Sequence, residues 1–231
     1  MKTIGLIGGM SWESSAEYYR IINEKVKEKL GGLHSAKCLM YSVDFAEVES
    51  LQQLAKWEEA ADLLIDAAKK LERGGADFLL ICANTMHKVA EEIQRNIQIP
   101  ILHIVDATAE KIQAAGQKRI GLLGTRFTME EPFYKARLAE KFNLDILIPE
   151  ADEREFVNQV IFKELCLGVI QESSRSRFIH IIEQLSNKGA EAVILGCTEI
   201  PLLIKQVDVA IPLYDTTQLH AEAAVDFALA E

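Results

Sequence analysis

The sequence has few cysteines and no C-x-x-C pair among them. Its four cysteines lie far apart in the 231-residue chain, at Cys38, Cys82, Cys166 and Cys197. Closely paired cysteines are typical of zinc sites and of disulfide frameworks, so we expect neither a bound metal nor structural disulfides. Free, reduced thiols are the rule in the cytoplasm, and the cysteine pattern therefore predicts a cytoplasmic protein.

The sequence also lacks long apolar runs and an excess of basic residues. No run approaches the ~20 residues that a membrane helix needs. The N-terminal stretch MKTIGLIGGM is short and broken by glycine, so we expect a first strand and turn rather than a secretory signal. Acidic residues outnumber Lys and Arg by 35 to 25, and the net charge of −10 argues against nucleic acid or an anionic membrane as partner.

Short apolar runs alternate with amphipathic stretches along the whole chain, and 49% of the residues are hydrophobic. The expected strands are 3–7, 38–43, 78–82, 101–104, 120–123, 145–148 and 192–195. Helical patterns lie between them, for example at 14–30, 55–73 and 178–188, and SSAE (14–17) predicts a capping box at the start of the first helix. This alternation predicts an α/β fold with parallel sheets covered on both faces.

An internal repeat divides the chain into two halves. TIGLIGGMS (3–11) resembles RIGLLGTR (119–126), and GADFLLICANT (75–85) aligns without gaps with GAEAVILGCTE (189–199). A looser third match pairs Ile-Pro at 99–100 and Asp106 with Ile-Pro at 211–212 and Asp215. General likeness among α/β units is the alternative, but three matches in one order favour two pseudo-symmetric domains. We expect residues 1–105 plus 214–231 to form the first domain and 106–213 the second.

The gapless alignment pairs Ala83 with Cys197 and Cys82 with Gly196. Side chains alternate across a strand, so Cys82 is expected to point away from the side to which position 83 points. We therefore expect Cys82 to be a buried packing residue, as free cysteine often is. Cys38 and Cys166 are expected to be packing residues as well.

In open parallel sheets, ligands bind beyond the carboxyl ends of the strands. Two such domains facing one cleft would present one strand end to each side of a small molecule. This geometry suits removal of a proton from one face of a carbon and its return to the other. A thiol serves in both directions, as thiolate base and as thiol acid.

Several motifs resemble the aspartate/glutamate racemase family over essentially the whole chain. They are GGMSWES (8–14), the Asn84-Thr85 pair, LGTRFT (123–128) and GCTE (196–199), and IPEADER (148–154) is similar to the enterobacterial branch with its broad-specificity and L-Asp/Glu-specific racemases. The resemblance implies a cofactor-independent racemase with two Rossmann-like domains, an active site in the cleft between them, two catalytic cysteines and a homodimeric state. Cys197 matches the second cysteine, and Ala83 occupies the position of the first.

Alanine has no proton to exchange, and three explanations stay open for Ala83. The residue can be an introduced Cys→Ala or Thr→Ala change, since relatives with threonine there act on one enantiomer only. Another donor, such as Cys82, Thr85, His87 or water, can replace the missing thiol. The chemistry can also need one cysteine, as in the related arylmalonate decarboxylases. A non-catalytic relative that binds an amino acid is a further alternative.

Polar residues follow the expected strand ends. Asn84, Thr85 and Thr198 are candidates for holding the substrate α-carboxylate and stabilising the enolate-like charge, although turns and helix caps favour the same residue types. Met10 and Ser11 in the first turn, and Thr128 in the equivalent turn of the second half, are candidates on the same argument.

The resemblance adds two substrate contacts, Glu199 for the ammonium group and Gln52; without it, Glu199 reads as a helix N-terminal acid. His87 is expected to orient the Asn-Thr turn. A side-chain carboxylate would need a cation, for which Arg126 and Lys163 are candidates, each as readily explained as a surface charge. The expected ligand is an amino acid, with aspartate or glutamate favoured.

Overall fold

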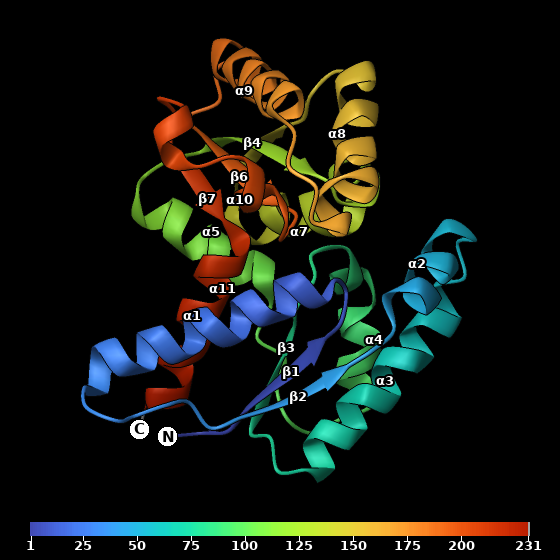
Figure 1. Cartoon of the computed structure of the whole chain (residues 1–231), viewed down its shortest axis with the longest axis vertical. Coiled ribbons are helices and arrows are strands. Elements are labelled where there is room, and N and C mark those ends of the chain that lie inside the picture. Colours follow the sequence, from blue (N-terminus) through green and yellow to red (C-terminus); the bar gives the residue numbers. More distant parts are fainter. Residues whose placement is uncertain (231) are drawn as a thin grey trace. The chain divides into compact units, whose positions relative to one another are not determined.

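A computed structural model describes residues 1–230 and divides into two α/β units (Figure 1). Unit 1 comprises Met1–Ile104 with the C-terminal segment from His220 on, and unit 2 comprises Val105–Leu219. Each unit has a parallel sheet flanked by helices, as the strand–helix alternation predicts. The domain boundaries inferred from the repeat, 1–105 plus 214–231 and 106–213, stay a prediction. No helix within residues 1–230 combines the length and apolar character needed to cross a membrane.

The sheet of unit 1 has three parallel strands in the order β2-β1-β3: β1 (Ile4–Gly8), β2 (Cys38–Ser42) and β3 (Phe78–Ile81). The strand expected at 101–104 is wrong, because this segment makes a single parallel bridge, between Ile101 and Leu79. Ile104 already begins the helix α5 (Ile104–Ala114), which leaves too few extended residues for a strand.

Helices cover both faces of this sheet (Figure 1). On one face, α1 (Trp12–Leu30) and α11 (Thr216–Leu229) bury apolar side chains against β1 and β3. On the other face lie α3 (Trp57–Arg73), α2 (Phe45–Gln53), the 3₁₀ turn η1 (Thr85–Val89) and α4 (Ala90–Arg95). In α11 the buried apolar residues are Ala221, Ala224, Val225 and Ala228, a spacing that places them on one helical face.

The first helix begins at Trp12, two residues earlier than the sequence predicts. Its N-cap is Ser11, whose side chain accepts a hydrogen bond from the Ser14 N–H. The capping box expected at Ser14 is wrong, because Ser14 and Ser15 form the buried first turn of the helix.

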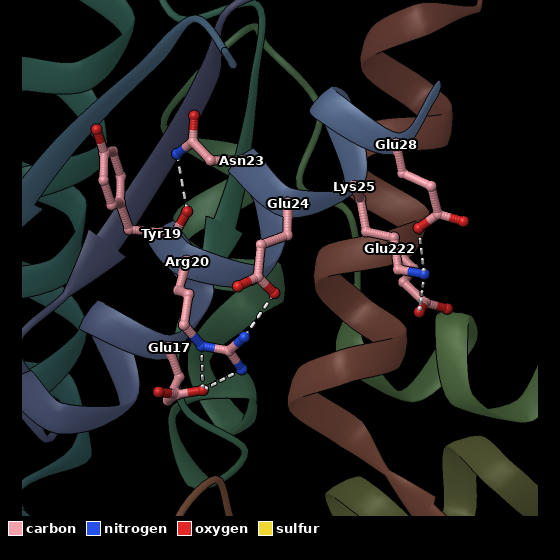
Figure 2. A network of polar contacts seen from close by, with 8 residues as sticks. All are labelled: Glu17, Tyr19, Arg20, Asn23, Glu24, Lys25, Glu28 and Glu222. Atoms are coloured by element: carbon pink, nitrogen blue, oxygen red, sulfur yellow. Dashed lines mark hydrogen bonds and ion pairs between the residues drawn. The ribbon is translucent and has the colours of Figure 1, made fainter. Parts of the chain in front are cut away.

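Charged residues occupy the exposed face of α1, as Figure 2 shows. Arg20 makes ion pairs with Glu17 and Glu24, while Lys25 lies between Glu28 of the same helix and Glu222 of α11. Exposed pairs of this kind contribute little stability, ~0–1 kcal/mol each, so the buried face holds α1 in place.

The sheet of unit 2 has four parallel strands in the order β5-β4-β6-β7. They are β4 (Arg119–Gly124), β5 (Asp145–Leu147), β6 (Ala192–Gly196) and β7 (Leu213–Asp215), of which β7 was not among the expected strands. The helices α8 (Ala151–Lys163) and α9 (Glu172–Asn187) cover one face through a shared core cluster. The unit also contains α5, α6 (Arg126–Glu130), α7 (Pro132–Phe142), η2 (Leu165–Leu167), α10 (Ile200–Leu203) and η3 (Gln206–Asp208).

The internal repeat extends to individual hydrogen bonds. The Leu79 N–H donates to the Pro100 carbonyl at 2.9 Å, and the Val193 N–H donates to the Pro212 carbonyl at 2.9 Å. These four residues are equivalent in the sequence alignment, so the bridge beside β3 in unit 1 corresponds to β7 beside β6 in unit 2. The two sheets therefore share one strand order and one register.

Candidate active site

The polar residues expected to bind substrate lie buried beyond the carboxyl ends of the central strands in each unit. In unit 1 they follow β1 and β3 or come from α2, and none is more than 7% exposed: Ser11, Gln52, Asn84 and Thr85. In unit 2 they follow β4 and β6 and are equally buried: Thr128, Thr198 and Glu199. Ligands of open parallel sheets bind beyond the carboxyl ends of the strands, so each strand-end region is a candidate ligand site.

The turn after β1 depends on a glycine. Gly9 has a φ of +94°, and a Cβ there would lie 2.2 Å from the Val43 carbonyl oxygen and 2.6 Å from the Val43 nitrogen. The Gly9 N–H donates to the Ser15 hydroxyl at 2.8 Å, and this hydroxyl donates to the Ser11 carbonyl at 3.0 Å. The turn is therefore tied to the first turn of α1, which fixes the backbone on either side of the cis peptide bond between Met10 and Ser11.

Cys82 and Ala83, which follow β3, have side chains in different core clusters. Cys82 is fully buried in the core cluster that contains α1 and α11, whereas Ala83 lies with Met10 in the cluster that contains α3. The two side chains therefore face opposite sides of the sheet, as the alternation predicts. Burial raises the pKa of the Cys82 thiol, so this cysteine is a neutral packing residue in the folded chain.

His87 joins this segment to the start of α5. Its Nδ1 lies 2.8 Å from the Ala83 carbonyl oxygen, and its Nε2 accepts the Ile104 N–H at 3.2 Å. Both ring nitrogens are engaged by the backbone, which agrees with the expected local role in orienting the Asn84-Thr85 turn.

Gln52 reaches the same region from α2. Its side chain is 4% exposed, and its Nε2 donates to the Met86 sulfur at 3.1 Å. Met86 shares the core cluster of Ala83. Unit 1 thus brings Met10, Gln52 and Ala83 into one region, with Ser11 in the neighbouring turn.

Unit 2 places a thiol and a carboxylate in direct contact. The Cys197 Sγ–H donates to Glu199 Oε2 at 2.9 Å, and both residues are buried. Burial raises the pKa of the Cys197 thiol well above its usual range, and the Glu199 carboxylate raises it further. The thiol form of Cys197 is therefore strongly favoured in the ligand-free protein.

Cys197 and Ala83 occupy equivalent positions. Cys197 lies in the core cluster of Val193 and Leu195, four and two residues before it. Ala83 has the same relation to Leu79 and Ile81 in unit 1. The alignment of the two halves therefore extends to the side of the sheet on which each side chain lies.

The turn after β4 carries Thr128. Thr125 caps α6 by accepting the Thr128 N–H, as Ser11 caps α1, so Thr125 is the structural counterpart of Ser11. A Cβ at Gly124 or Gly196 would lie about 3 Å from Thr128 side-chain carbons, which shows that Thr128 packs against the ends of β4 and β6. Thr128 is therefore next to the residue that precedes Cys197. The sequence analysis did not identify Thr125 as a helix cap, although threonine is a preferred N-cap residue and could have been recognised as one.

The two candidate cations differ from these buried groups in their exposure. The Arg126 and Lys163 side chains are exposed, and the Arg126 N–H donates to the Asn158 side chain at 2.8 Å. These observations do not favour either residue as the group that binds a substrate carboxylate. In residues 1–230 no group of three His, Cys, Asp or Glu side chains is arranged to hold a metal ion.

Each of the two strand-end regions offers groups suited to proton transfer. One offers a buried thiol with its own proton acceptor, the other offers amide, hydroxyl and peptide groups around a methyl side chain, and proton transfer at a carbon uses such groups. The family profile described as Asp/Glu/hydantoin racemase matches residues 7–224. The chain belongs to this family.

Individual relatives agree with that assignment. A Yersinia pestis protein provisionally assigned as an Asp/Glu racemase is 52% identical, with a TM-score of 0.93 and complete coverage of both chains. An aspartate racemase homologue from Pyrococcus horikoshii is 38% identical, with a TM-score of 0.86 and the same coverage. The broad-specificity amino-acid racemase RacX of Bacillus subtilis is 30% identical over 75% of this chain and 74% of its own length. A glutamate racemase from Actinobacillus pleuropneumoniae is 26% identical over 67% of this chain and 59% of its own length.

Proposed function

We propose that this protein is a cofactor-independent amino-acid racemase of the aspartate/glutamate type that transfers protons directly at the α-carbon. In this proposal Cys197 acts on one face of that carbon, and Ala83 occupies the position from which a second group would act on the other face. The family assignment and the names of the relatives support an amino acid as substrate.

The hydrogen bond from Cys197 to Glu199 is the observation that carries the proposal. A packing cysteine needs no acceptor, whereas this thiol lies 2.9 Å from a buried carboxylate at the end of a central strand. A carboxylate at this distance opposes thiolate formation in the free protein. An arriving substrate ammonium group that pairs with Glu199 would cancel this effect, so the thiolate would form only with substrate present.

The proton balance of the step is simple. The Cys197 thiolate takes the α-proton and becomes a thiol, and the electron pair of the C–H bond stays on the carbanion as enolate-like charge. The same thiol returns a proton to the same face. Inversion needs a proton from the opposite face, which the methyl group of Ala83 cannot supply, so racemisation by the unsubstituted protein is slow and depends on another donor such as water.

Asn84, Thr85 and Thr198 have the groups to bind the α-carboxylate and to stabilise the developing charge. N–H and hydroxyl donors aimed at that charge are usually the largest single contribution to such catalysis. All three residues are at most 7% exposed, and donors in a buried position interact more strongly with a carboxylate than donors in water.

The substitution Ala83→Cys tests the two-face proposal. We expect racemisation of aspartate or glutamate to rise by at least roughly an order of magnitude, the low end of general acid–base effects. Ala83→Ser is the matched control, because it has nearly the same size but no acidic thiol. Racemisation is followed by chiral chromatography. Equal rates for Ala83→Cys, Ala83→Ser and the unsubstituted protein, with folding and binding intact, would contradict the proposal.

A second candidate function is a single-cysteine decarboxylase. The protonated state of Cys197 favours it, because loss of CO₂ from a substituted malonate leaves a carbanion that needs one proton on one face. Release of CO₂ from arylmalonates, without α-proton exchange on any amino acid, would replace the racemase by this activity. Binding of an amino acid with neither reaction would point to a sensor.

A further inference from the structure

The buried imidazole of His87 connects two backbone segments that are far apart in sequence. It is 4% exposed and sits in η1, immediately after the Ala83-Asn84 peptide. Its Nδ1 is 2.8 Å from the Ala83 carbonyl oxygen and its Nε2 is 3.2 Å from the Ile104 nitrogen.

These two contacts fix the protonation of the ring. The Ile104 N–H can only donate, so Nε2 must carry a lone pair and cannot carry a proton. The Ala83 carbonyl can only accept, so Nδ1 must carry the proton. His87 is therefore a neutral imidazole in its Nδ1–H form, because an imidazolium would place two N–H groups against each other at Ile104.

Neighbouring rings hold the imidazole in place. The His103 ring centroid is 4.5 Å from that of His87, and the His220 ring of α11 is 5.8 Å away, edge-on. His220 is itself tied to Tyr18 of α1 at 2.8 Å and to the Leu102 carbonyl at 2.8 Å. The ring of His87 therefore has little freedom to rotate away from Ala83.

The bond from Nδ1–H fixes the direction of a peptide group in the proposed site. The Ala83–Asn84 peptide is trans, since the one cis bond in residues 1–230 is at Met10–Ser11. In a trans peptide the C=O and N–H point in opposite directions. Because His87 holds the Ala83 carbonyl, the Asn84 N–H points away from His87. The His87 N–H also donates to the Asn84 carbonyl at 3.1 Å, which anchors the following peptide.

We propose that His87 is a positioning residue: by holding the Ala83 carbonyl with Nδ1–H, it aims the Asn84 N–H at the α-carboxylate of the amino-acid ligand. The inference rests on the proposed function and assigns one of its carboxylate donors. His87 transfers no proton in this role, because both of its ring nitrogens are occupied by the backbone.

Two substitutions separate the two bonds of the ring. In His87→Asn, the side-chain NH₂ group can take the place of Nδ1–H at the Ala83 carbonyl. In His87→Gln, the longer side chain can place its oxygen near the position of Nε2 and accept the Ile104 N–H. His180→Gln is the control, because it makes the same replacement at an exposed histidine of unit 2, whose ring lies against Gln184.

The first measurement is the tautomer of His87, read from its ring ¹⁵N shifts by NMR in the full-length protein. The Nδ1–H form supports the proposal, and the Nε2–H form or an imidazolium overturns it. This measurement requires no ligand, so it stands even if the proposed racemase activity fails.

The second measurement is binding of L- and D-aspartate and glutamate by calorimetry, with melting temperatures as a check on folding. His87→Asn and His180→Gln should bind within about threefold of the unsubstituted protein, whereas His87→Gln should bind about tenfold more weakly, the effect of one lost hydrogen bond. Equal binding by His87→Asn and His87→Gln, or weaker binding by His87→Asn alone, overturns the positioning role. Absence of binding by the unsubstituted protein instead counts against the proposed function.

Discussion

Replacing Glu199 by glutamine should lower the pKa of the Cys197 thiol and make the thiol more reactive. The substitution keeps the size of the side chain and an oxygen acceptor but removes the negative charge that lies 2.9 Å from the sulfur. Two unit charges ~4 Å apart repel by ~4 kcal/mol at an effective dielectric constant of ~20. A tenfold change in the ionised fraction needs only ~1.4 kcal/mol. We therefore expect the pKa of Cys197 to fall and its thiolate fraction near neutral pH to rise at least about tenfold.

The assay is the rate of alkylation by iodoacetamide as a function of pH, with Cys197 identified by peptide mass spectrometry. The thiolate is the reacting species, so the rate reports the ionised fraction. Glu153→Gln is the control, because Glu153 is a buried carboxylate of the same unit that accepts the Glu150 N–H instead. The reasoning is refuted if Glu199→Gln and the unsubstituted protein show the same pH profile for Cys197.

Two further predictions concern stability. Gly9→Ala should cost at least about 2 kcal/mol in the free energy of unfolding, because its φ of +94° and the backbone contact of a Cβ both oppose a side chain; Gly31→Ala, with φ +73° and open space around it, should cost clearly less in the same denaturant titration. Burial raises the pKa of Asp106, but its hydrogen bonds to Arg137 and Lys141 outweigh this and lower it. Asp106→Asn should therefore cost about 1–3 kcal/mol at neutral pH. Because the pKa of Asp106 is lowered on folding, the difference should shrink as the pH falls below the unfolded pKa of ~4, and a constant difference down to about pH 2 would contradict the assignment.

Most correct predictions about the strands and the candidate site came from the internal repeat. It aligned Ala83 with Cys197 and predicted that Cys82 faces the other side of the sheet, because side chains alternate in direction along a strand. It also contained the signal for β7, through the match between the Ile-Pro pairs, although the apolar pattern alone favoured a strand at 101–104.

The capping pattern failed to predict the start of the first helix, because two positions fitted it. Ser14 with Glu17 has the spacing of a capping box, yet Ser11 reaches the cap position first, with an extended backbone at φ −83° and ψ 175°. Capping patterns recur at neighbouring serines, so the spacing alone could not decide between them.

Contacts between distant segments were beyond the sequence. The bond from Ile104 to His87 spans 17 residues and that from Gln52 to Met86 spans 34. Such pairs depend on how helices pack on the sheet, which no periodic pattern encodes. The family resemblance identified Gln52 as a candidate, and the structure shows that its side chain contacts Met86.

Solvent deuterium exchange at the α-carbon tests the central claim most directly. Aspartate and glutamate are incubated with the protein in D₂O, and loss of the α-proton signal is followed by NMR for the unsubstituted protein, Cys197→Ala and Cys166→Ala. We predict exchange by the unsubstituted protein and by Cys166→Ala, and none by Cys197→Ala. Exchange that continues in Cys197→Ala at the original rate would remove this thiol from the chemistry and contradict the account.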